Sequence, residues 1–150
     1  MQLHPRPATV SPPALRLLAT SRAALREAQR AESAPERYAT AHLAALRAAA
    51  AILAARARPG DARTRRPTSA WVLLSTVEPE LGEWAAYFAA GADKRAAALA
   101  GMRSAVTARE ADDLLRDAGI FLALVETTLG LLPQDQITQH DTAPVLHRAG

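Results

Sequence analysis

The sequence predicts an all-α protein, a single helical bundle of four to five helices between disordered termini. Hydrophobic residues make up 49% of the 150-residue chain but aromatic residues only 4%, and about a quarter of all residues are alanine. An apolar set dominated by Ala and Leu favours helices that approach one another closely, whereas a sheet would need more β-branched and aromatic residues. A chain of this length is expected to form one domain with a substantial core.

The first predicted elements are two long helices. Residues 1–11 are rich in proline and are expected to form a disordered arm, after which Ser11-Pro12-Pro13 begins a helix over about 12–31. Ser33-Ala34-Pro35-Glu36 combines a capping residue with a first-turn glutamate and begins a second helix over about 34–57. Arg58-Pro59-Gly60 ends this helix, because proline and glycine interrupt helical hydrogen bonding.

Shorter helices follow a basic linker at 61–68. Thr68 or Ser69 caps a short helix, Pro79 opens another, and Gly91 marks a break before a helical stretch over 92–102. The aromatic residues of this region recur at helical spacing, which favours a role in the core over a base-stacking surface. They are Trp71, Trp84, Tyr87 and Phe88.

The last predicted helix begins at a capping box, Thr107-Ala108-Arg109-Glu110, and spans about 107–129. Beyond Gly130 the chain turns polar and loses its periodicity, so residues 131–150 are expected to form a disordered tail and the bundle to occupy 12–130. One face of the last helix is apolar. Its residues are Ala111, Leu115, Ala118, Leu122, Val125 and Leu129.

Composition excludes several classes of function. The chain has no Cys, so it has neither disulfides nor thiolate metal sites, and its four His residues lack a zinc-like spacing. No metal and no cofactor is therefore expected. No uninterrupted apolar run is long enough to span a membrane, and the N-terminus lacks the apolar core of a signal peptide. We expect a cytoplasmic protein with no membrane partner.

The charges are distributed unevenly. Residues 1–66 hold 12 Arg and four acidic residues, a net charge of +8, whereas residues 67–150 hold six basic and 11 acidic residues, a net charge of −5. This asymmetry fits either a basic face for a polyanion or charge-matched contacts between the two halves. An acidic edge on the last helix supplies partners for such contacts, and its residues are Glu110, Asp112, Asp113 and Asp117.

The second helix carries the candidate catalytic residues. Tyr38 and His42 share a stripe with Ala45, Ala49 and Ile52, so the stripe faces other helices and the helix is predicted to be central. His42 is then either a buried, hydrogen-bonded side chain or a general acid or base at a cleft.

Arg37 lies five positions before His42, which places the two side chains roughly 140° apart on a regular helix. If a dimer cleft brought them together, His42 could assist attack by a ribose 2′-hydroxyl while Arg37 stabilised charge on the phosphate. This chemistry would be metal-independent cleavage of RNA.

The arginines around the linker are candidate contacts to nucleic acid, because guanidinium groups bind phosphates through fixed pairs of donors. A solvated charged loop is the alternative. These arginines are Arg56, Arg58, Arg63, Arg65 and Arg66.

The stretch from Glu36 to His42, with the alanine-rich helix after it, resembles HEPN domains (higher eukaryotes and prokaryotes nucleotide-binding), and the small stand-alone actinobacterial branch most of all. Residues 84–95 and 106–115 support the resemblance, which covers about 12–130. It implies a helical bundle that usually dimerises. Many such domains are metal-independent endoribonucleases of toxin or defence systems, and others are non-catalytic modules that bind RNA or nucleotides.

We therefore predict a HEPN-like module that associates with RNA or nucleotides, forms a homodimer and is non-catalytic. Active members of the family carry their Arg–His pair at the start of a late helix, often with a polar residue directly after the Arg. Here Arg37 and His42 lie on the second helix and Tyr38 follows the Arg. The alternatives are an endoribonuclease that uses Arg37 and His42, and a structural helical partner in a DNA-repair or toxin–antitoxin assembly.

Overall fold

The computed structural model describes residues 9–58 and 69–132, and within these ranges it contains helices and no strand. The all-α prediction is confirmed. Most of the predicted disordered arm and tail lies outside the described residues. The elements are α1 (Pro12–Arg30), α2 (Ala34–Arg56), α4 (Ala70–Val77), η1 (Pro79–Leu81), α5 (Gly82–Ala90), α6 (Ala92–Leu99), η2 (Arg103–Ala105) and α7 (Ala108–Thr128).

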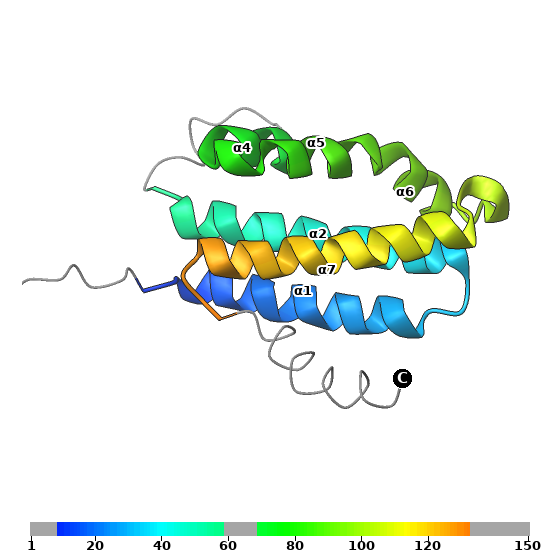
Figure 1. The fold of residues 1–150 in the computed structure, drawn as a ribbon, viewed down its shortest axis with the longest axis horizontal. Coiled ribbons are helices and arrows are strands. Elements are labelled where there is room, and N and C mark those ends of the chain that lie inside the picture. The colour runs from blue at the N-terminus through cyan, green and yellow to red at the C-terminus, as the bar shows by residue number, and fades with distance from the viewer. Residues whose placement is uncertain (1–8, 59–68, 133–150) are drawn as a thin grey trace, which may run out of the picture.

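The helices form two layers (Figure 1). The long helices α1, α2 and α7 lie side by side in one layer, and the shorter helices α4, α5 and α6 run along the other. Helix α2 is central, because it contacts α1, α7, α4 and α6. The buried side chains of α2 therefore lie among several other elements.

Small side chains let the neighbouring helices pack closely around α2. Its predicted core stripe is confirmed, since Tyr38, His42, Ala45, Ala49 and Ile52 are all buried. Alanines give a central helix a thin profile and allow short distances between helix axes. At the contact with α1, the Ser21 hydroxyl donates a 2.7 Å hydrogen bond to the Ala44 carbonyl oxygen.

Helix α2 is also long and apolar enough to cross a membrane by length and composition alone, with a mean hydropathy of 1.3 over its most apolar window. This stretch of α2 contains charged residues. It is therefore not one continuous apolar run, and a search for such a run does not detect it. A central helix of a bundle passes the same test, and 56% of this window is buried among other helices. Its apolar character is explained by this packing.

The predicted helix starts are confirmed at their caps. Ser11, Ser33 and Ser69 each accept a hydrogen bond from a backbone N–H in the first turn of the helix that follows. Thr107 and Glu110 form a reciprocal capping box at α7, with distances of 2.9 and 3.0 Å. Such caps satisfy backbone donors that the helix itself leaves unpaired.

Two glycines end helices in the left-handed conformation. Gly130 has φ +80° after α7, where it accompanies the bond from Leu131 N–H to the Glu126 carbonyl. Gly101 has φ +85° and takes the same left-handed conformation after α6. This motif is typical of helix C-termini. It ends α6 at Leu99, three residues before the predicted boundary at 102.

Aromatic side chains join the two layers. Trp71, Phe88 and Phe121 are buried, with ring centroids 5.1 to 6.1 Å apart. Trp84 is half-buried, but Tyr87 is 43% exposed, so the core assignment of Tyr87 is wrong. Tyr87 lies on the side of α5 that faces α7, where its hydroxyl bonds Asp117. On α7, the predicted Leu115 is half-buried and Leu114 is buried instead.

Candidate functional site

The first half of α2 places Tyr38 and His42 on one buried face, one helical turn apart. Their rings stack with centroids 6.4 Å apart and an interplanar angle of 22°. Both residues are largely inaccessible, with exposed fractions of 6% and 2%. Each nevertheless carries a polar group that must find a partner or face a cavity.

His42 is held in the core of the monomer. Its Nε2 atom lies 2.8 Å from the Phe88 carbonyl oxygen, so Nε2 carries the proton that is donated. The ring also makes edge contacts with Trp71 and Phe88 at 5.9 and 6.1 Å. Nδ1 is buried and has no hydrogen-bond partner among the described residues.

Burial lowers the pKa of His42 below its ordinary value, because the core disfavours the charged imidazolium. The hydrogen bond to Phe88 acts in the opposite direction, and the positive charge of Arg95 lowers the pKa further. The imidazole is therefore neutral and enclosed, and its one proton is bonded to the Phe88 carbonyl. This geometry fits the interpretation of His42 as a buried, hydrogen-bonded side chain.

Arg37 serves a different part of the bundle. Its Nη1 lies 3.1 Å from Asp112 Oδ1 on α7, and its Nη2 donates a 2.8 Å hydrogen bond to the Ala31 carbonyl at the end of α1. The guanidinium thus ties the start of α2 to two neighbouring segments. Within the monomer, Arg37 and His42 make no contact with each other and engage separate partners.

The predicted arginine cluster is only partly described. Arg56 forms a 3.0 Å ion pair with Glu78, which follows α4, and Arg58 is exposed beyond the end of α2. Arg63, Arg65 and Arg66 lie outside the described residues. The cluster stays a prediction.

The acidic edge pairs with the first half of the chain less than predicted. Asp112 binds Arg37, but Glu110 pairs with Lys94, and Asp113 and Asp117 pair with arginines of α7 itself. The shortest ion pair between the halves, among the described residues, joins Arg22 on α1 to Glu126 on α7 at 2.7 Å. Charge-matched contacts between the halves therefore exist, through other residues.

A cleft that sequence reasoning missed opens between α5–α6 and α7. It has a volume of about 300 Å³, and its apolar residues are Ala90, Gly91 and Leu114. Its polar residues are Tyr38, Tyr87, Lys94, Glu110 and Asp113. Within the described chain, no group of three or more His, Asp or Glu side chains could hold a metal ion here or elsewhere.

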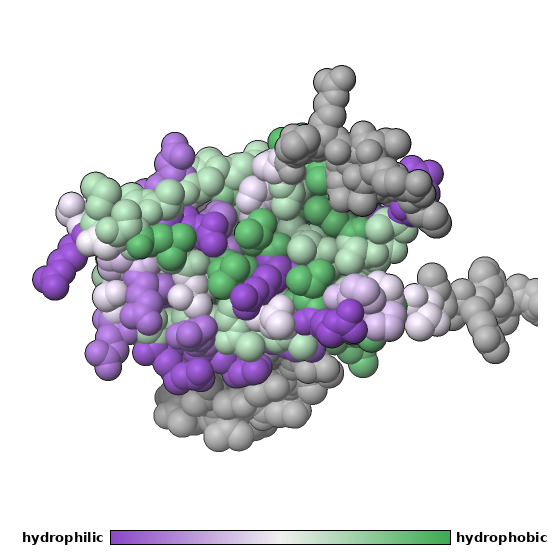
Figure 2. Space-filling view, turned by 180° about the vertical axis from the view of Figure 1, so that it is seen from behind, coloured by the Kyte–Doolittle hydropathy of each residue, from purple (hydrophilic) through white to green (hydrophobic). Residues whose placement is uncertain are grey.

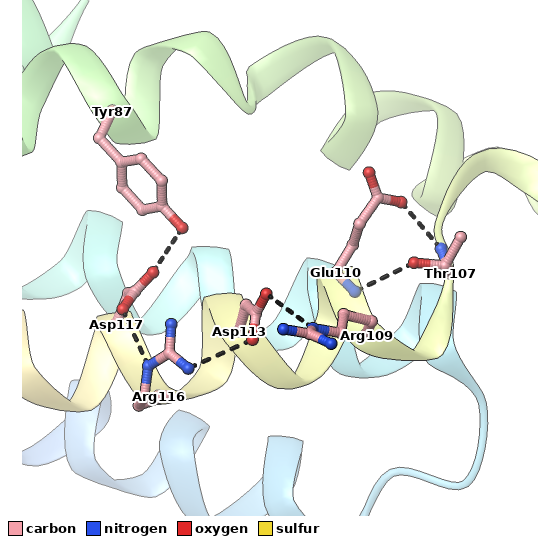
Figure 3. A network of polar contacts seen from close by, with 7 residues as sticks. All are labelled: Tyr87, Thr107, Arg109, Glu110, Asp113, Arg116 and Asp117. Atoms are coloured by element: carbon pink, nitrogen blue, oxygen red, sulfur yellow. Dashed lines mark hydrogen bonds and ion pairs between the residues drawn. The ribbon is translucent and has the colours of Figure 1, made fainter.

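Polar contacts fix the walls of this cleft (Figure 3). Tyr87 reaches from α5 toward α7 and donates a 2.6 Å hydrogen bond to Asp117 Oδ2. Lys94 donates to Glu110 Oε2, while Glu110 Oε1 accepts from the Thr107 N–H. Asp113 receives Arg116 at 3.2 Å and Arg109 at 3.7 Å.

These contacts set the charge states of the cleft. The hydrogen bond with Glu110 raises the pKa of Lys94, and the same bond lowers the pKa of Glu110, so both groups stay charged at neutral pH. Burial raises the pKa of Tyr38, and the nearby Glu110 raises it further, against the effect of Lys94. Tyr38 therefore stays a neutral hydroxyl that can donate a hydrogen bond.

Gly91 makes room for this hydroxyl. A Cβ atom at position 91 would lie 2.5 Å from the Tyr38 oxygen, a distance that real Cβ atoms essentially never show. The sequence signals were present but separate: a tyrosine on the core stripe, a glycine at a helix break and a capping-box glutamate. Only the fold brings them to one place.

Among the comparisons with known proteins, the family model for SAV_6107-like HEPN domains matches residues 28–126. The match covers well over half of the chain and runs from the end of α1 to the last turn of α7. No curated protein and no solved structure matches.

Proposed function

The chain belongs to the SAV_6107-like HEPN family, and from this premise we propose that it is a non-catalytic module that associates with RNA or nucleotides and forms a homodimer. The observation that carries the non-catalytic part is the enclosure of His42. Its Nε2 is bonded to the Phe88 carbonyl and only 2% of the residue is exposed. A general base must come within hydrogen-bond reach of the proton that it removes.

Exposed arginines on α1 support binding to a polyanion. Arg16, Arg26 and Arg30 are exposed and form no ion pair with any residue that the structure describes. The described residues up to 58 hold eight Arg and three acidic residues, a net charge of +5. Guanidinium groups that are not neutralised by the protein can release counterions from a nucleic-acid backbone.

The half-buried apolar side of α2 supports the homodimer. Helix α7 covers α2 in Figure 1, and on the opposite face of the molecule (Figure 2) apolar residues run across the middle between hydrophilic ones. The apolar positions of α2 that are not fully buried recur at helical spacing: Leu43, Leu46, Ala50 and Leu53. A second copy of this face would remove them from water.

The non-catalytic proposal is tested by incubating the pure full-length protein with mixed RNAs in EDTA, beside a His42→Gln variant. We expect intact RNA in both reactions. Cleavage that leaves 2′,3′-cyclic phosphate ends and is lost in the variant would overturn the proposal and restore the alternative that uses Arg37 and His42.

Binding is tested by the salt dependence of RNA affinity. Replacing Arg26 and Arg30 by Gln should weaken binding several-fold and flatten the plot of log affinity against log salt, because fewer counterions are released. Gln29→Ala, which changes an exposed side chain of α1 without changing its charge, is the matched control and should have little effect. The homodimer is tested separately, by sedimentation of the wild type and of Leu43→Glu. We expect a dimer for the wild type and a monomer for the variant. A wild-type monomer would contradict the homodimer.

A further inference from the structure

We infer that the cleft between α5–α6 and α7 binds a nucleobase that carries an exocyclic amino group. This inference rests on the proposed association with RNA or nucleotides, and it specifies which part of that ligand the cleft receives. The base comes either from a free nucleoside or from an unpaired residue of RNA.

The Tyr38 hydroxyl is the observation that points to a ligand. Tyr38 is 6% exposed, it lines the cleft, and its oxygen forms no hydrogen bond with any residue in the described part of the chain. A buried polar group without a partner costs free energy unless water or a ligand satisfies it. The Tyr38 oxygen is not among the buried side-chain atoms of the described residues that lack a partner, so it opens into the cleft, where it can bond water or a ligand.

The other polar groups of the cleft supply acceptors. Glu110 and Asp113 each accept only part of the hydrogen bonds that a carboxylate can take, so both retain acceptor capacity. The Tyr38 hydroxyl is a donor beside them. A ligand with an amino group next to a ring nitrogen or carbonyl matches this combination, as in adenine, cytosine and guanine, and carboxylates accept from the cytosine amino group in nucleic-acid recognition.

Tyr87 at the rim of the cleft offers a stacking partner for a planar ring. Tyr87 is 43% exposed at the rim, and its bond to Asp117 holds the phenol in place. Aromatic side chains at such positions stack with unpaired bases. A volume of about 300 Å³ lies at the small end of ligand pockets and suits one base or nucleoside.

The charge of the lining excludes phosphate from the interior of the cleft. Its single cation, Lys94, is already paired with Glu110, and Asp113 adds a second carboxylate. Asp113 is itself paired with Arg109 and Arg116, so the lining holds no unpaired cation for a phosphate. The cleft therefore takes the base, and the phosphates stay outside it.

The test titrates the full-length protein with cytidine, adenosine, guanosine and uridine, using calorimetry together with amide chemical shifts. We expect the three amino-bearing nucleosides to bind and to shift the Gly91 and Lys94 amide signals, and uridine to bind at least several-fold more weakly. Inorganic phosphate should not shift these signals. Short single-stranded RNAs that each contain only one kind of base show whether the cleft takes the base from a free nucleoside or from an unpaired residue of RNA.

Two variants locate the effect. Tyr38→Phe should weaken cytidine binding about three- to tenfold through loss of one hydrogen bond, while Thr40→Val, which removes a hydroxyl elsewhere on α2, should leave it unchanged. Asp113→Asn should narrow the preference for cytidine over uridine, because an amide can donate to the uridine carbonyl. Thermal unfolding shows that each variant is folded.

Equal binding of uridine and cytidine, or no effect of Tyr38→Phe in a folded protein, would overturn the inference. If RNA binds with the arginine dependence proposed above but no nucleoside shifts the Gly91 signal, the cleft assignment alone fails. If no RNA and no nucleoside binds, the proposed function fails with it.

Discussion

The imidazole of His42 on α2 donates from Nε2 to the Phe88 carbonyl on α5, 2.8 Å away, while its Nδ1 lies buried with no partner among the described residues. The bond joins the two layers of the bundle at their aromatic core. It also fixes the tautomer, because a carbonyl oxygen can only accept. A second proton would have to enter at Nδ1, where no group of the described residues accepts a hydrogen bond from it.

The stability of the protein should therefore fall in mild acid. The pKa of His42 in the folded state is lowered from 6.5 by burial, while the unfolded chain keeps the ordinary value. Above 6.5 both states are neutral at this residue and stability does not depend on its titration. Below pH 6.5, His42 becomes protonated in the unfolded chain but stays neutral in the folded chain. The free energy of unfolding therefore decreases until the pH reaches the folded-state pKa of His42.

Urea unfolding between pH 7.5 and 5 measures this effect. His42→Gln is the matched variant, because its amide can donate to the Phe88 carbonyl but does not titrate. The wild type should lose more free energy of unfolding over this range than the variant does. Parallel pH profiles would show that the titration of His42 is not linked to folding.

Gly91 and Tyr38 form a second coupled pair. Gly91→Ala should destabilise the protein by ~1–3 kcal/mol, because the methyl group would lie 2.5 Å from the Tyr38 oxygen and the buried ring cannot withdraw without repacking. The backbone itself tolerates alanine, since φ is −87° and ψ is 0°. The other nearest atoms, Phe88 O and His42 Cδ2, lie at ordinary distances of 3.5 and 3.7 Å.

A double-mutant cycle measured by urea unfolding tests this pair. In the Tyr38→Phe background the obstructing oxygen is gone, so Gly91→Ala should cost little or even stabilise the helix junction. Equal costs in both backgrounds would mean that Gly91 is required for another reason.

The fold was readable from the sequence because its signals are local. A serine or threonine before each of α1, α2, α4 and α7 predicts a helix start, and the spacing of Tyr38 and His42 predicts a buried stripe. The sequence predicts the end of α6 three residues too late, because a run of small residues carries little information about where helical hydrogen bonding stops. Gly101, with its positive φ, ends the helix before Met102.

The candidate site was less readable because it depends on distances between helices. Periodicity placed His42 on the packing face, but only the fold shows that the Phe88 carbonyl occupies its Nε2. Tyr87 was assigned to the core because aromatic residues usually are buried, whereas its hydroxyl is drawn to Asp117 at the rim of the cleft. Partners 30 to 50 residues apart in sequence leave no local pattern.

The last prediction concerns the ion pair between Arg22 and Glu126, which holds α1 against α7. Its side chains are 19% and 3% exposed, so the carboxylate lies almost entirely outside water. Arg22→Met keeps the apolar stem but removes the charge opposite a buried carboxylate, and it should cost ~2–3 kcal/mol of unfolding free energy. Asp112→Ala is the matched control, because Asp112 is 66% exposed, Arg37 keeps its bond to the Ala31 carbonyl, and such an exposed pair contributes ~0–1 kcal/mol. Chemical denaturation of both variants at pH 7 decides the question: equal costs would mean that burial does not set the strength of these two bridges.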